Sequence, residues 1–128
     1  PFLKEKRCSI HSFRPGICRV FPLGRIYEEN RLDYFLQVDG CAKENRSKIK
    51  VSKWLDTPEL KKNQQYLIDW HAFRKKIKSI LGEMSDENQK KTITMFLLNT
   101  FYINPYDTEQ DFYLQFYARL DRIAQVIA

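Results

Sequence analysis

Glycine is scarce in this sequence, with four residues in 128. Loops that cradle phosphate groups are rich in glycine, so the chain has little material for a nucleotide-binding loop. The motifs G-x-G-x-x-G, G-x-x-x-x-G-K-[ST], G-x-S-x-G, H-E-x-x-H and C-x-x-C are absent as well. Because these enzyme signatures are missing, the sequence favours a binding protein over an enzyme.

Long hydrophobic runs are also missing. The longest, Met95–Leu98, has four residues, whereas a helix that crosses a bilayer needs about 20. No secretory signal pattern opens the chain. We therefore expect a cytoplasmic protein with no membrane contact. Because the chain begins at Pro1 and not at methionine, we also expect it to be a piece of a longer protein.

Cysteine is present three times, at Cys8, Cys18 and Cys41. A secreted disulfide scaffold normally has a denser and even-numbered set, so this count favours a reducing compartment. In that setting, grouped cysteines more often bind metal. The other interpretation is that they are buried free thiols that act as small apolar side chains.

The net charge of +6 is unevenly distributed. Lysine and arginine outnumber aspartate and glutamate by 12 to 7 over residues 1–56, but only by 10 to 9 over residues 57–128. A basic surface attracts nucleic acid, anionic lipid or an acidic protein. The alternative is that these cations are solvated or flank an anionic thiolate–metal centre.

The composition, 43% hydrophobic and 14% aromatic, fits one domain over residues 1–128 with a core of its own. We expect an α+β fold in which an irregular cysteine-bearing segment and a small β-hairpin, within 1–56, pack on a three-helix bundle, within 57–128. Prolines and glycines predict turns over residues 1–24, with one short helical turn at 16–21. Five apolar side chains should dock this segment: Ile10, Phe13, Ile17, Val20 and Phe21.

The alternating pattern from Arg25 to Val38 predicts the hairpin, with its turn at Asn30. Residues 49–53 could form a short extended piece. Helices are expected from Asp56, as the N-cap, to Leu81; from Ser85 to about Tyr102; and from Asp107 onward. We expect the second of these helices to be the central helix of the bundle. Inward positions in the hairpin are expected at Ile26, Leu32, Tyr34, Leu36 and Val38.

The segment from Cys8 to Pro22 carries the most chemistry. Its Pro15-Gly16 turn can fold the chain back so that Cys8 and Cys18 face one centre. Thiolate sulfur is a good ligand for zinc and iron, and a structural site usually needs four ligands. Cys41, which follows the hairpin, and His11 could complete the set.

Arg14 and Arg19 flank Cys18. A guanidinium there can donate hydrogen bonds to thiolate sulfur and offset its negative charge. Arg14 could equally brace the turn by bonding backbone carbonyls.

The same segment resembles a known family. The pattern Cys8-x-Ile10-His11-x-x-Arg14-Pro15-x-x-Cys18-Arg19-x-Phe21-Pro22 is similar to C-x-I-Y-x-x-R-P-x-x-C-R-x-F-P, which is half of the signature of the YkgJ-like cysteine-cluster proteins. These are described as zinc- or iron-chelating. Further segments are similar to clostridial-type members: Leu23–Tyr27, Tyr34–Gln37, Cys41, Lys53-Trp54 and Asp69–His71.

The resemblance implies metal ligation by Cys8, Cys18 and Cys41, with zinc, iron or an iron–sulfur cluster as cofactor. His11 stands where the family often has tyrosine. Family members also carry an upstream C-x-x-C-x-x-C-C cluster, which these 128 residues do not contain. A missing upstream cysteine segment is therefore an expected partner of the site.

Two other functions remain open. A basic-surface interaction module would bind nucleic acid or an acidic protein, and binding that weakens steeply with salt would favour it. A metal-dependent modifying enzyme is the third possible function, since similar cysteine clusters occur in proteins with modifying activities. The basic face would include Lys43, Arg46, Lys48, Lys50 and Lys53.

Overall fold

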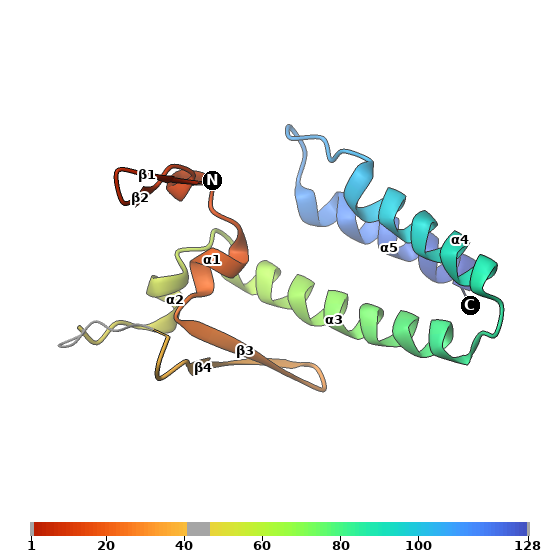
Figure 1. Ribbon diagram of the computed structural model, residues 1–128, viewed down its shortest axis with the longest axis horizontal. Coiled ribbons are helices and arrows are strands. Elements are labelled where there is room, and N and C mark those ends of the chain that lie inside the picture. Colours follow the sequence, from red (N-terminus) through yellow and green to blue (C-terminus); the bar gives the residue numbers. More distant parts are fainter. Residues whose placement is uncertain (1, 41–46, 128) are drawn as a thin grey trace. The chain divides into compact units, whose positions relative to one another are not determined.

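The computed structural model describes residues 2–40 and 47–127 (Figure 1). Helices and two small antiparallel hairpins make up the described chain, which confirms the predicted α+β class. The chain divides into two compact units, Pro1–Ile68 and Asp69–Ala128, and the boundary in the sequence falls within helix α3 (Leu60–Glu83). The expectation of one domain, divided near residue 56, stays a prediction.

The first hairpin pairs β1 (Leu3–Lys4) with β2 (Arg7–Cys8). Its turn residues, Glu5 and Lys6, both have positive φ, at 49° and 63°. That geometry matches the twist of a two-residue hairpin but usually takes glycine or asparagine. Our prediction of turns without strands was wrong here, because Glu5-Lys6 carries none of the usual turn signals.

The second hairpin pairs β3 (Leu23–Glu28) with β4 (Arg31–Leu36), as predicted. Asn30 closes the turn at a φ of 58°, a conformation that asparagine tolerates well. Ile26 pairs with Asp33 and so lies on the face opposite Leu32, which is the buried residue of this hairpin. The expected inward positions were therefore wrong for Ile26, and they were wrong for the exposed Leu36 and Val38.

Two short helices, α1 (Gly16–Val20) and α2 (Val51–Leu55), contact each other. Each helix has one buried residue, Val20 in α1 and Leu55 in α2, and both are 3% exposed. The predicted helical turn at 16–21 is confirmed, but the extended piece at 49–53 was wrong, since α2 occupies much of it. The expected docking was also wrong for the exposed side chains Phe13, Ile17 and Phe21.

Helix α3 begins at Leu60, four residues after the predicted N-cap. Asp56 instead ends α2 in the left-handed region, with φ of 45°. A residue in that conformation terminates a helix, so Asp56 cannot cap the next one. In the first unit, Gln64 Nε2 donates to the Tyr34 hydroxyl at 3.5 Å and links α3 to β4.

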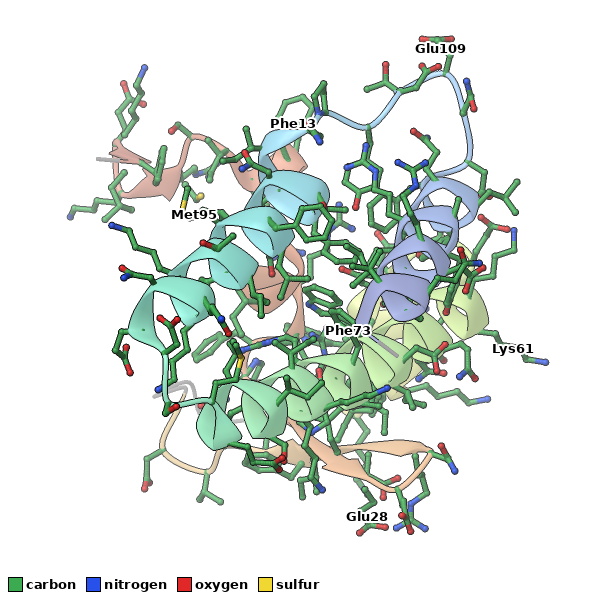
Figure 2. All side chains as sticks on the ribbon, turned by 90° about the vertical axis from the view of Figure 1, so that its right-hand side faces the viewer. Phe13, Glu28, Lys61, Phe73, Met95 and Glu109 are labelled. Atoms are coloured by element: carbon green, nitrogen blue, oxygen red, sulfur yellow. The ribbon has the colours of Figure 1, made fainter. Side chains whose placement is uncertain are left out.

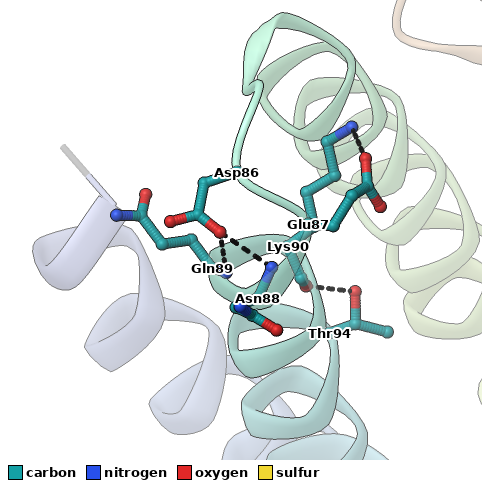
Figure 3. A network of polar contacts seen from close by, with 6 residues as sticks. All are labelled: Asp86, Glu87, Asn88, Gln89, Lys90 and Thr94. Carbon is teal, nitrogen blue, oxygen red and sulfur yellow. Dashed lines mark hydrogen bonds and ion pairs between the residues drawn. The ribbon is translucent and has the colours of Figure 1, made fainter.

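Helix α4 (Glu87–Leu98) begins with a side-chain cap (Figure 3). Asp86 Oδ1 accepts hydrogen bonds from the backbone N–H groups of Asn88 and Gln89, at 2.8 and 3.2 Å. Such a cap satisfies N–H groups that the first helical turn leaves without partners. The helix starts close to where the sequence predicted. None of the residues of α4 itself is buried, and the buried residue of the predicted helix is Phe101, in the segment that follows α4.

A π-helix, η2 (Asn99–Ile103), continues α4. Arg119 donates to the carbonyls of Thr100, Asn104 and Pro105 at 2.6, 2.8 and 2.6 Å. Its guanidinium also lies 3.8 Å from the ring centre of Tyr106. Burial raises the pKa of the Tyr106 phenol, and the Arg119 cation opposes this rise. One arginine thus fixes the end of the π-helix.

Helix α5 (Phe112–Ile127) begins five residues after Asp107, where the sequence predicted its start. Asp111 accepts from the N–H of Leu114, whereas Asp107 accepts from Glu109 and caps a separate turn. Side chains from α3, η2 and α5 form the core of the second unit, and Figure 2 shows Phe73 among these helices. The buried members are Ile77, Phe101, Phe116 and Ile123.

Aromatic rings fill the centre of this core. The Trp70 ring centre lies 4.8 Å from that of Phe101 and 5.6 Å from that of Phe116. These separations and the tilted ring planes are typical of stabilising aromatic pairs. The Tyr117 hydroxyl, which donates to Asp69 at 2.7 Å, joins α5 to α3 at the edge of the core.

Candidate functional site

Cys8 is the last residue of β2 and its thiol is exposed and free. Beyond it, Ser9 closes the hairpin, because its backbone N–H and its hydroxyl both donate to the Phe2 carbonyl, at 2.8 and 3.0 Å. The backbone around Cys8 is therefore held by local hydrogen bonds while the sulfur stays accessible. An accessible thiol on an ordered backbone can ionise and bind a metal.

Cys18 lies in the middle of α1 and is also exposed and free. Two residues along a helix correspond to about 200° of rotation, so Cys18 projects away from the buried Val20. Bonds to the Pro15 carbonyl from the N–H groups of Cys18 and Arg19, at 2.9 and 3.1 Å, fix the first turn. Both described cysteines thus present their sulfur to solvent, and neither fills the core as a small apolar side chain.

Two side chains tie the segment around Cys18 to α2 and to the residue that follows it. Arg19 Nε donates to the Arg14 carbonyl at 3.3 Å, and Arg19 Nη1 donates to the Asp56 carbonyl at 3.2 Å. Trp54 Nε1 donates to the Phe21 carbonyl at 3.1 Å. The hydrogen bonds to backbone carbonyls that the sequence suggested for Arg14 are therefore made by Arg19.

The other predicted ligands have different places. His11 is exposed in the short 3-10 helix η1 (His11–Phe13), and Arg14 is half-buried in the extended link that follows. Cys41 lies outside the described residues. Within residues 2–40 and 47–127, no group of three His, Cys, Asp or Glu side chains is placed to share one ion. The described chain thus supplies two accessible thiols and no complete site.

A second feature, which the sequence did not reveal as a site, is a groove of about 730 Å³ in the second unit. One wall is α3 from Trp70 to Leu81, and the other comes from α4 and η2. The sequence interpretation had assigned Leu97 and Leu98 to a central core helix. The run of apolar residues at Met95–Leu98 was the only signal in the sequence for this groove. Helical periodicity does not tell which of these side chains packs against another helix and which stays exposed.

No family model, curated protein or solved structure compared with the chain matches it. Among the helices of the described residues, none has the length and apolarity needed to cross a membrane.

Proposed function

We propose that the thiolates of Cys8 and Cys18 bind zinc or iron. The observation that carries this proposal is that both cysteines are exposed and free on short, hydrogen-bonded elements of one unit. Soft sulfur donors suit zinc, iron and iron–sulfur clusters. The number of donors fits half of a four-ligand site.

Two thiolates leave a four-coordinate metal incomplete. Cys41 is the next donor we propose, and cysteines outside these 128 residues would supply the rest. When bound, zinc would cross-link the segment as a structural ion, whereas iron or an iron–sulfur cluster would allow electron transfer. His11 is available as a further nitrogen donor, because its side chain is exposed.

Arg19 has a supporting role in this proposal. It adjoins Cys18 in sequence, and its guanidinium is held by bonds to the Arg14 and Asp56 carbonyls. A cation fixed beside a thiolate offsets part of the negative charge that several thiolates bring to one ion. Arg14, half-buried four residues before Cys18, adds a second positive charge to the same short segment.

The setting we propose is the cytoplasm, where thiols stay reduced. Membership of the YkgJ-like family is likewise a proposal, resting on the segment from Cys8 to Pro22. The cytoplasmic setting and the family membership are both consistent with cysteines that act as metal ligands and not as disulfide partners.

Plasma mass spectrometry on anaerobically purified protein tests the metal site. We expect zinc or iron to accompany the wild-type chain and to be lost from the Cys8→Ser, Cys18→Ser double variant. Should the gene encode further residues, the longer protein is measured in the same way, and we expect it to hold metal more nearly one to one. Cobalt substitution adds a second readout, because thiolate ligation produces intense near-ultraviolet charge-transfer bands.

Ser12→Ala is the matched control, since Ser12 is exposed within the same segment. It should leave the metal content unchanged. Equal metal content in the wild type and the double cysteine variant would contradict ligation by these residues. Absence of zinc and iron from every wild-type form would do the same.

A second candidate function is supported by the exposed lysines near α2. Lys48, Lys50 and Lys53 are all exposed, and Trp54 beside them is 40% exposed. No ion pair links these lysines to a carboxylate of the described residues. Cations interleaved with an aromatic ring favour a polyanion such as single-stranded nucleic acid.

Salt dependence of binding to a fluorescent oligonucleotide tests this second function. The interaction should weaken steeply as salt rises and persist after metal is removed by a chelator. Replacing Lys48, Lys50 and Lys53 by glutamine should abolish it, whereas the Cys8→Ser, Cys18→Ser variant should bind normally. No binding at low salt would reject the interaction module.

A further inference from the structure

The groove in the second unit follows helix α3 for about three turns. Its wall on α3 runs from Trp70 to Leu81, which at 1.5 Å per residue corresponds to about 16 Å. The opposite wall consists of Thr94, Leu97 and Leu98 of α4 and Tyr102 of η2. Both walls belong to the second unit, and the lining residues on α3 extend along about three turns of that helix.

The lining is apolar at its base and positive at one rim. Trp70, Phe73, Ile77 and Leu81 contribute the apolar part from α3. The charged residues of the lining, Arg74, Lys75 and Lys78, are all cations on the same helix, and all three are exposed. No aspartate or glutamate is among the described residues that line the groove.

The far wall remains open to solvent. Leu98 is 39% exposed and Tyr102 is 66% exposed, although both are large apolar or aromatic side chains. Pockets for small molecules usually bury 70–90% of the ligand surface, which an open groove of this kind does not do. The geometry suits an occupant that covers the groove with one face and keeps its own polar face in water.

We propose that this groove binds an acidic amphipathic helix of a partner protein. The apolar stripe of such a helix, with residues at i, i+3, i+4 and i+7, would cover Ile77, Leu81 and Leu97. Carboxylates beside the stripe would meet Arg74, Lys75 and Lys78, which lie within about one turn of α3. The site is independent of the cysteines and of the proposed metal function.

A synthetic helical peptide tests the proposal with the full 128-residue chain. The probe is a fluorescein-labelled peptide of about 16 residues, with leucines at helical spacing and glutamates on both flanks of the stripe. Fluorescence anisotropy should show saturable binding. The double variant Arg74→Glu, Lys78→Glu should weaken it by about tenfold or more, and a peptide with lysines in place of the glutamates should restore binding to that variant.

Lys76→Glu with Lys91→Glu is the matched control, because both lysines are exposed on α3 and α4 but do not line the groove. It changes the net charge equally and should bind the acidic peptide about as well as the wild type. The proposal is overturned if the wild type does not bind the peptide, or if the two double variants weaken binding equally. It is also overturned if dodecanoate saturates the groove in place of the peptide, or if sedimentation shows that a second copy of the chain occupies it.

Discussion

The second unit has an aromatic core, whereas the first is held together mainly by backbone pairing and by side-chain bonds to carbonyls. In the second, Phe101, Phe116 and Ile123 are at most 5% exposed. In the first, Val20, Leu32 and Leu55 are buried in different short elements. Hydrophobic burial is the main favourable term in folding, so the second unit should be the more stable of the two.

This difference explains why the exposed thiols lie in the first unit. Short hairpins and single-turn helices bury little surface, and they leave Cys8 and Cys18 open to solvent. A metal that cross-linked these elements would stabilise them in the way that hydrophobic burial stabilises the helices. We therefore expect zinc or iron to protect the first unit from hydrogen exchange far more than the second.

The largest effect is expected from Phe116→Ala. Phe116 is 2% exposed and contacts the rings of Trp70 and Phe101, so its truncation leaves a cavity in the aromatic core. We expect a loss of about 3–5 kcal/mol in the free energy of unfolding, measured with urea. Leu114→Ala, at a 74% exposed position of the same helix, should change it little. Equal effects of the two would contradict a core at Phe116.

Leu55→Ala tests the first unit in the same way. Leu55 is 3% exposed and buried with α2 against α1, so we expect a loss of about 2–4 kcal/mol in the stability of that contact. Hydrogen exchange followed by mass spectrometry should show faster exchange over residues 16–22 and 51–56. Unchanged exchange in both segments would show that this contact is not what orders them.

Arg119→Met should have the next largest effect. It removes the donors to Thr100, Asn104 and Pro105, and bonds from a charged group contribute about 1.5–3 kcal/mol each at most. We expect a total loss in that range, because water replaces the exposed bonds. The same variant should raise the pKa of Tyr106 further, since the Arg119 cation lowers it. Ultraviolet titration measures this pKa, and the difference from the Tyr106→Phe variant isolates the signal of the Tyr106 phenol. A lower pKa of Tyr106 in Arg119→Met would contradict the contact between Arg119 and Tyr106.

Asp86→Ala removes the cap of α4. The Asp86 carboxylate accepts from two backbone N–H groups, so we expect a loss of about 1 kcal/mol in unfolding free energy. Asp86→Asn should recover most of it, because asparagine is an equally good N-cap. If both substitutions destabilise equally, charge and not capping is the main contribution.

The smallest effect is expected from Arg31→Ala in the first unit. Arg31 forms ion pairs with Glu28 and Asp33 at 2.7 and 2.8 Å, but all three side chains are about half exposed. Exposed pairs contribute about 0–1 kcal/mol and are screened by salt. We expect a change within about 0.5 kcal/mol in urea unfolding that vanishes at high salt. A salt-independent loss comparable to that of Leu55→Ala would contradict this assignment.

Local sequence signals predicted the hairpin at Asn30 and the three long helices, because turn chemistry and helical periodicity act over a few residues. These signals failed at the starts of two helices, where two acidic residues close together in the sequence could each have been the N-cap. Asp111 caps α5 although Asp107 has the same chemistry, and Asp56 ends α2 instead of starting α3. The candidate thiols were predictable as residue types, but their exposure was not.

The sequence by itself determined the α+β class and the positions of most elements, and it indicated which cysteines are candidate ligands. Only the tertiary structure decided which apolar side chains are covered, because burial depends on which faces of distant elements meet. It buried Phe116 and left Tyr102 exposed, and it bonded Arg119 to carbonyls at least 14 residues away. The groove along α3 arises in the same way, since its two walls are brought together by packing and not by any local pattern.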